Sequence, residues 1–195
     1  MSFALNRRNP RNPAEEGINQ FQAPRPIRPD AKKIIFMKKI IIKLSVAEIV
    51  YDIQNKTYLT GKSRRDGTNH ETVAAMQAND DFENANQVLR SVTSAFSLLK
   101  TRLSEYLDLV ETTVSNEPLE ADRQLELALM MPSNYNVSSA ETISSMAHAY
   151  IVAMAVGDWF TITDKKDAAD YYKSAADCLA SICEAAHKRV RPTRV

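Results

Sequence analysis

A run of apolar residues at helical spacing occupies the middle of this 195-residue chain and most constrains its fold. The apolar positions follow one another in steps of three and four, the spacing of one face of an α-helix. They are Phe82, Ala85, Leu89, Val92, Phe96, Leu99, Leu103, Tyr106 and Val110. Asp80 and Glu83 stand where acidic residues cap a helix. The pattern predicts one long central helix over 80–112, roughly 45 Å long at about 1.5 Å per residue.

Two more helices are predicted near the C-terminus. Ser138 and Glu141 have the spacing of a capping box, and Asp164 stands at the expected start of the last helix. Their apolar positions are Ile143, Met146, Tyr150, Ile151 and Met154 in the first, and Ala168, Tyr171, Tyr172, Ala175, Leu179, Ile182 and Ala186 in the second. Because the second face is rich in small residues, we expect the two helices to approach closely as an antiparallel hairpin over 138–190.

Two short segments indicate strands. Residues 34–44 are β-branched, and their lysines suit an edge strand, while residues 125–130 alternate apolar and other side chains up to Pro132. We expect these strands to pair. Ser45 and Glu48 form a capping box that opens a helix ending by Gly61, followed by a polar loop over 61–78. The predicted fold is therefore mainly α: a helical bundle with a long central helix, a C-terminal hairpin and a small two-stranded β element.

The net charge of +1 conceals an uneven distribution. Residues 1–65 carry 14 basic and 5 acidic side chains, a charge of +9, whereas residues 66–186 carry 7 basic and 19 acidic ones, a charge of −12. Residues 187–195 add 4 basic side chains and no acidic one. An acidic middle between two basic ends favours contacts between the ends and acidic surfaces, or between the ends and phosphate.

The chain divides into an extended basic arm (1–36), a mainly helical domain (37–187) and a basic C-terminal tail (188–195). The arm holds five of the eight prolines and no apolar period, so we expect it to be extended or polyproline II-like until a partner orders it. The candidate partner-binding residues are Arg7, Arg8, Arg11, Arg25 and Arg28 in the arm, and Lys188, Arg189, Arg191 and Arg194 in the tail.

Sequence patterns that suggest catalysis or ligand binding are incomplete. The Gly61-Lys62-Ser63 tripeptide resembles the end of a phosphate-binding loop, but Lys56 stands where that motif requires glycine. Glu184 and His187 have the spacing of half a di-iron site, without a second such pair. We interpret His187 as a residue favoured by the helix dipole at the C-terminus of the last helix. No catalytic residue, cofactor or metal is predicted, and we expect the protein not to be an enzyme.

The remaining chemically distinctive residues are interpreted as structural. Three acidic residues of the last helix, Asp164, Asp167 and Asp170, suit the first turns of a helix. His148 and an aromatic group of Trp159, Phe160, Tyr171 and Tyr172 are interpreted as packing residues. Cys178 and Cys183 point to different faces of one helix, so we expect two free, partly buried thiols. Neither a signal peptide nor a membrane span is recognisable.

The order of several segments resembles a group of small virion proteins encoded among head and tail genes of phages and prophages of gut Bacteroidales. The segments are MKKIIIKLS, YLTG, LELALMMPSNYN, DWFTIT and KRVRPTR. The resemblance covers roughly residues 37–194 and implies an adaptor or ring component of the portal-proximal head–tail connector. It implies a mainly helical homo-oligomeric ring that contacts the portal and neighbouring connector or tail proteins through terminal extensions, without catalytic residues. The implied location is the virion, and the host cytoplasm during assembly. The arm, residues 1–36, departs from the pattern.

Three classes of function remain open from the sequence. The first is a structural assembly protein whose basic ends bind acidic surfaces of neighbouring subunits. The alternative is a nucleic-acid-associated protein that contacts phosphate through its arm and tail, including contact with packaged DNA. An enzyme using the group around residues 159–172 is a third reading.

Overall fold

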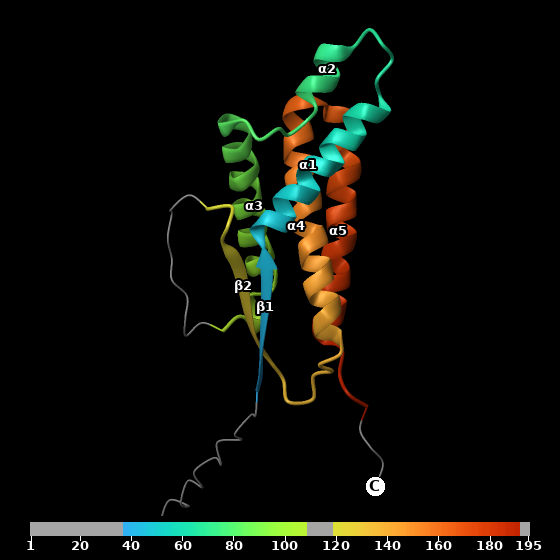
Figure 1. Ribbon diagram of the computed structural model, residues 1–195. Coiled ribbons are helices and arrows are strands. Elements are labelled where there is room, and N and C mark those ends of the chain that lie inside the picture. Colours follow the sequence, from blue (N-terminus) through green and yellow to red (C-terminus); the bar gives the residue numbers. More distant parts are fainter. Residues whose placement is uncertain (1–36, 109–118, 192–195) are drawn as a thin grey trace, which may run out of the picture. The chain divides into compact units, whose positions relative to one another are not determined.

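The computed structural model describes residues 37–108 and 119–191, all of which belong to the unit formed by Ile35–Val195. This part of the chain is mainly helical with a small antiparallel sheet, as the sequence predicts (Figure 1). Its elements are β1 (Lys38–Ser45), α1 (Val46–Ser63), α2 (His70–Ala75), α3 (Phe82–Arg102), the 3-10 turn η1 (Ser104–Tyr106), β2 (Gln124–Met131), α4 (Ser139–Thr163) and α5 (Lys165–His187). The arm over 1–36 and Arg194 lie outside the described residues.

The predicted pairing of the two strands is confirmed. β1 and β2 are antiparallel, with Ile42 opposite Leu127 and Leu44 opposite Leu125. These four side chains are buried, whereas Lys43, on the other face, is exposed and forms an ion pair with Glu126 at 2.9 Å. The sheet therefore has one apolar and one solvated face, which is the origin of the period of two in both strands.

Helix α1 begins as predicted but ends later. The Ser45 hydroxyl accepts a hydrogen bond from the backbone N–H of Glu48 at 3.4 Å, which caps the first turn. Gly61 lies within the helix, and a Cβ there would be 3.1 Å from the carbonyl oxygen of Val73. Glycine thus permits α2 to approach α1, instead of ending the helix. Because Gly61-Lys62-Ser63 forms the last turn of α1, it does not form a phosphate-binding loop.

The predicted polar loop over 61–78 is wrong in part, because it contains α2 and three buried side chains. Val73, Met76 and Ala78 are 7, 5 and 4% exposed. The Thr57 hydroxyl accepts a hydrogen bond from the backbone N–H of Ala78 at 3.1 Å and thereby fixes the chain after α2 against α1.

The prediction of a helix over 80–112 is wrong at both ends. The N-cap is Asp81, without a side-chain capping bond, and Phe82 is 84% exposed. α3 ends at Arg102, after which Leu107 bridges to Leu129 and the N–H of Asp108 donates to the carbonyl of Ala128 at 3.1 Å. Residues 107–108 satisfy their backbone by adding to the edge of β2, so the helix cannot continue through them. Residues 109–112 lie outside the described part.

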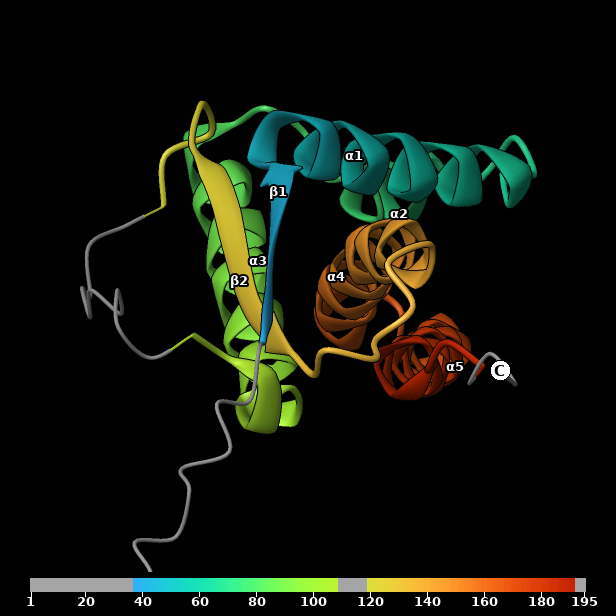
Figure 2. The same ribbon diagram turned by 90° about the horizontal axis from the view of Figure 1, so that it is seen from below.

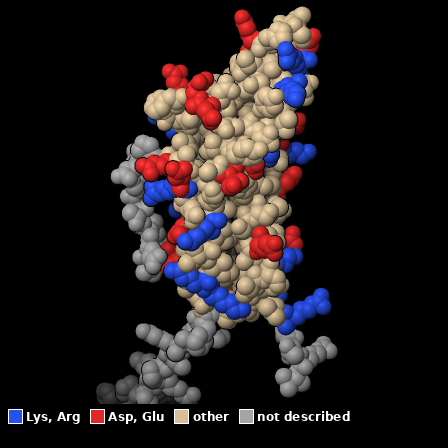
Figure 3. All heavy atoms as spheres, viewed as in Figure 1, with Lys and Arg blue, Asp and Glu red and all other residues tan. Residues whose placement is uncertain are grey.

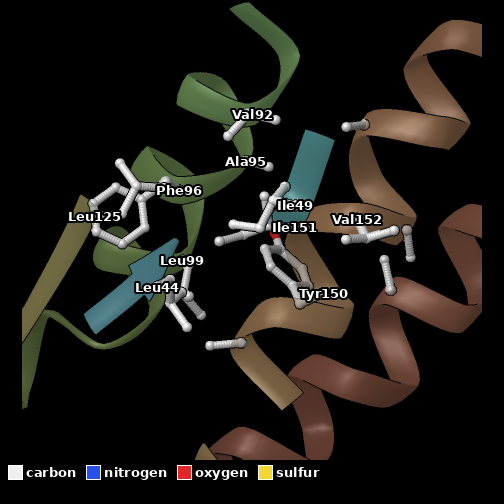
Figure 4. Packing of buried hydrophobic residues seen from close by; sticks show 14 of the residues in the cluster. Leu44, Ile49, Val92, Ala95, Phe96, Leu99, Leu125, Tyr150, Ile151 and Val152 are labelled. Atoms are coloured by element: carbon white, nitrogen blue, oxygen red, sulfur yellow. The ribbon is translucent and has the colours of Figure 1, made fainter. Parts of the chain in front are cut away.

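Helix α4 holds the central position that the sequence assigned to α3. It contacts α1, α3, α5 and β1 and is apolar around most of its circumference, which is typical of a helix surrounded by other elements. Seen from below, α4 lies between α5 on one side and the sheet with α3 on the other (Figure 2). The hydrophobic core fills the space between α1, the sheet, α3 and α4. Figure 4 shows its residues Leu44, Ile49, Val92, Ala95, Phe96, Leu99, Leu125, Tyr150, Ile151 and Val152.

The predicted C-terminal pair of helices is present, joined by Asp164 alone. The Asp164 carboxylate accepts from the backbone N–H of Lys166 at 3.1 Å and caps α5 as predicted. The capping box predicted for Ser138 is wrong. Its hydroxyl donates to the side-chain carbonyl of Asn136 at 2.9 Å and makes no capping bond to α4, because Asn136 organises this turn.

Candidate partner-binding surface

Both ends of the described chain meet the loop between β2 and α4. The Lys38 ammonium, at the start of β1, donates to the carbonyl of Tyr135 at 3.1 Å. From the other end of the chain, the carbonyl of Lys188 accepts from the N–H of Asn136 at 3.1 Å, and the N–H of Val190 donates to the carbonyl of Asn134 at 2.8 Å. β1 thus begins, and the segment after α5 ends, at one end of the domain (Figure 1).

The segment after α5 is extended and held in place. α5 ends at His187, and Lys188 has φ −64° and ψ 130°, which takes the chain out of the helix. The Arg189 guanidinium donates to the carbonyl of Ala186 at 2.8 Å, where a cation is favoured by the helix dipole. An antiparallel bridge between Tyr135 and Arg189 completes the attachment. The direction in which the tail leaves the domain is therefore fixed up to residue 190.

These contacts bring four basic residues to one end of the domain, and we call them the exit surface: Lys38, Lys188, Arg189 and Arg191. Several Lys and Arg side chains gather at this lower end in Figure 3, and most acidic side chains of that face lie higher. Arg191 is exposed, and Lys188 is paired with Glu184 on the surface at 2.5 Å. The hydrogen bond from Lys188 lowers the pKa of Glu184. The arrangement can attract carboxylates or phosphates by charge.

Tyr135 anchors the loop beneath this surface. Its side chain is fully buried, and its hydroxyl has no hydrogen-bond partner within the described part of the chain. Burial raises the pKa of this hydroxyl, while the nearby charge of Arg189 acts in the opposite direction. The loop is therefore held by a packed ring and by backbone hydrogen bonds, which keeps residues 38 and 188–190 next to the same loop.

The structure places only three of the predicted partner-binding residues, Lys188, Arg189 and Arg191, and it brings them to one end of the domain. The arginines of the arm and Arg194 lie outside the described residues. Lys38 was absent from the predicted set, although it contacts the same loop as the tail residues. The lysines that open β1 were the available signal in the sequence, but taken alone they indicate only an edge strand.

The remaining polar candidates have structural contacts. Nδ1 of His187 lies 2.6 Å from the carbonyl of Cys183, and because a carbonyl only accepts, Nδ1 carries a proton. Arg64 pairs with Asp164 and Asp167, which connects the end of α1 to the start of α5. Nε2 of His148 in α4 lies 2.9 Å from Oδ2 of Asp52 in α1.

The aromatic group near residues 159–172 is part of the helix packing. Trp159 is 7% exposed and its indole N–H donates to the carbonyl of Met76 at 2.9 Å, while the rings of Phe160 and Tyr171 pack 5.4 Å apart. The Tyr172 hydroxyl donates to Asp158 at 2.8 Å. Cys178 and Cys183 are free and partly buried, as expected. Among the described residues, no three His, Cys, Asp or Glu side chains come together in a way that could hold a metal ion.

No helix in the described ranges combines the length and apolarity needed to cross a membrane. Comparisons with protein-family models, curated proteins and solved structures found no match to this chain.

Proposed function

We propose that this chain is a structural subunit of a tailed-phage virion, an adaptor or ring component of the portal-proximal head–tail connector. The resemblance of residues 37–194 to small virion proteins supports the class of protein. The observation that carries the mechanism is the meeting of residues 38 and 188–190 on the loop at 134–136. Because the basic arm and the basic tail are attached at one end, they can act together on one neighbouring surface.

The charge distribution favours a contact between unlike surfaces. A basic end of one copy is complementary to the acidic body of the next, and repeating such a head-to-tail contact produces a closed ring when the rotation closes. The same basic end can bind acidic surfaces of the portal or of another connector protein. Since exposed charges are screened beyond about 8 Å at physiological ionic strength, the assembly should weaken as salt increases.

The test is native mass spectrometry of the full chain at low and high salt. The full chain should form a ring of defined copy number. We expect ring formation to be lost when the arginines of the arm and tail are replaced by glutamine. In the tail, Arg191→Gln and Arg194→Gln are preferable to a deletion from residue 188, because Lys188 and Val190 hydrogen-bond the loop at 134–136.

A matched control removes the same kind of charge elsewhere. Lys165→Gln with Lys166→Gln neutralises two exposed lysines at the start of α5, the end of that helix remote from the tail. This control should assemble normally. Unchanged rings in the arginine variants would contradict the mechanism, and detection of the protein in purified virions tests the location separately.

The nucleic-acid alternative gives a different result in a binding assay with random-sequence DNA. Phosphate contacts release counterions, so the logarithm of the affinity falls linearly with the logarithm of salt concentration, with a slope of about −0.9 per contact on duplex DNA. Useful affinity at physiological salt with a steep slope would favour this alternative. An absence of DNA binding together with ring formation would favour the connector proposal.

A further inference from the structure

The outer face of α1 exposes three large side chains. Tyr51, Tyr58 and Leu59 are 63, 46 and 52% exposed, while Ile49 and Ile53 on the opposite face are fully buried. Residues seven apart in a helix lie on the same side, so the two tyrosines lie in line about 10 Å apart along the axis. An aligned pair of exposed aromatic rings is a candidate contact surface.

An open hollow of about 220 Å³ lies beside Tyr58, and it is lined by Gln54, Tyr58, Gln77, Ala78, Asn79 and Asp80. Asp80 is held at its rim, because its carboxylate accepts a hydrogen bond from the Gln54 amide at 2.5 Å. Asp81 and Glu83 follow at the start of α3, and all three acidic residues are exposed. The hollow therefore combines an aromatic wall, amide groups and an acidic rim. Grooves lined by aromatic rings accept proline-rich segments.

We propose that this groove beside Tyr58, together with the exposed Tyr51 on the same face of α1, binds the proline- and arginine-rich segment at residues 23–29 of a neighbouring copy. That segment reads Ala-Pro-Arg-Pro-Ile-Arg-Pro. A polyproline II helix has three residues per turn and rises about 3.1 Å per residue, so residues three apart lie on one side about 9 Å apart. Pro26 and Pro29 match the spacing of the two tyrosines.

The arginines of the segment fit the acidic rim. Arg25 and Arg28 are also three apart, so they share one side of a polyproline II helix, next to the side that carries Pro26 and Pro29. When the prolines lie on Tyr51 and Tyr58, the arginines can reach Asp80, which the Gln54 amide holds beside α1. Arginine forms strong charge-assisted hydrogen bonds with carboxylates.

The segment is assigned to another copy because the ring proposed above brings the basic end of one copy to the acidic body of the next.

This inference rests on the proposed ring, and it names the surface that receives the arm. The first experiment measures binding of a fluorescent peptide with the sequence of residues 20–33 by anisotropy. The receptor is the full chain with Arg25→Glu and Arg28→Glu, whose own segment cannot compete. Replacement of Tyr51 and Tyr58 by alanine should weaken binding about tenfold or more, as expected for central aromatic contacts. Leu98→Ala, which alters a side chain of α3 with the same 46% exposure as Tyr58, should leave binding unchanged.

Exchanging the charges of the receptor and the peptide distinguishes specific docking from general electrostatic attraction. In a receptor that keeps Arg25 and Arg28, Asp80→Lys should weaken binding of the natural peptide, and a peptide carrying Arg25→Glu and Arg28→Glu should regain affinity for it. Equal binding of a scrambled peptide, or of the natural peptide to the double alanine variant, would overturn the docking site. Failure of both peptides to bind would also contradict the proposal.

Ring assembly distinguishes this inference from the function on which it rests. If neutralising the arm abolishes rings but the double alanine variant at Tyr51 and Tyr58 still forms them, the proposed function stands and the groove is not the receiver. If the peptide binds as expected but the full chain forms no ring, the groove is supported and the ring function fails.

Discussion

Gly157 of α4 packs against the ring of Tyr172 in α5, and its replacement by alanine tests that packing. A Cβ at this position would lie 2.9 Å from Cε1 and 3.1 Å from Cδ1 of Tyr172. Carbon atoms in favourable contact are about 3.5 to 4.0 Å apart, so the ring would have to move by more than half an ångström. We expect Gly157→Ala to destabilise the protein although alanine is the better helix former.

The expected change in the free energy of unfolding combines one stabilising contribution with two destabilising ones. Alanine gains about 1 kcal/mol over glycine in a helix interior. Displacing the ring costs about 1 to 3 kcal/mol as overpacking. It also strains the hydrogen bonds that the Tyr172 hydroxyl makes with Asp158 at 2.8 Å and Thr161 at 3.0 Å, each worth about 1 kcal/mol. The net destabilisation should be about 1 to 2 kcal/mol.

Urea unfolding followed by circular dichroism measures this change, and a second substitution makes the test specific. With Tyr172→Ala the ring is absent, so adding Gly157→Ala should stabilise the protein by about 1 kcal/mol, the helix-propensity term alone. The double-mutant cycle should therefore give a coupling energy of about 2 to 3 kcal/mol. If Gly157→Ala stabilises the protein with Tyr172 intact, or the coupling is absent, the proposed close contact between the helices does not exist.

Three further changes test other parts of the fold by the same unfolding assay. Arg64→Ala removes the partner of Asp164 and Asp167, and because the guanidinium side chain is 40% exposed, the loss should be about 0.5 to 1 kcal/mol and should shrink at high salt. Gly67→Ala should cost about 1 kcal/mol, because φ is +91° there, and Gly67→Asn should cost less. Tyr135→Phe should be neutral or slightly stabilising near pH 7, because the hydroxyl has no partner in the described part of the chain. Burial raises the pKa of Tyr135, so the folded state binds the phenolic proton more tightly than the unfolded state does. The resulting stabilisation is fully present below the pKa of about 10 in the unfolded state and is lost as the pH rises above it. The free energy of unfolding should therefore fall less steeply at high pH after Tyr135→Phe.

Local signals in the sequence predicted those elements whose ends are set by neighbouring residues. Ser45 caps α1 and Asp164 caps α5 through backbone N–H groups two or three residues away. The alternation in β2 predicted its buried face, because the side chains of a strand alternate whatever its partner. Each of these features depends on a few adjacent residues, so a reading of the sequence can recover it.

The end of α3 depends on a contact that sequence periodicity does not contain. Leu103 and Tyr106 continue the steps of three and four, but the N–H of Asp108 bonds to the carbonyl of Ala128, twenty residues later. Only the position of β2 determines that residues 107–108 leave the helix. Lys100 and Arg102, basic residues in the last turn of α3, were the available local signal of its end.

The sequence likewise predicted only part of the candidate site. Charge identified Lys188, Arg189 and Arg191 as a basic tail, but the proximity of Lys38 depends on the loop at 134–136, which receives contacts from both ends of the chain. The groove beside Tyr58 was missed because its walls come from α1 and from the residues after α2. Exposed tyrosines seven apart in a predicted helix were the signal for its aromatic wall.

The folded structure changes the meaning of the charge distribution along the chain. Part of the positive charge of residues 1–65 is paired inside the domain with acidic residues of the negative middle: Lys39 with Asp108, Lys43 with Glu126, and Arg64 with Asp164 and Asp167. These pairs reduce the field of both segments, so their formal charges overstate what a neighbour experiences. The acidic rim at residues 80–83 has no lysine or arginine among its ion-pair partners in the described residues, and Arg191 is exposed at the other end. The complementarity available to a second copy therefore resides in local surfaces, which is why substitutions at Tyr51, Tyr58 and Asp80 are more decisive than a change in total charge.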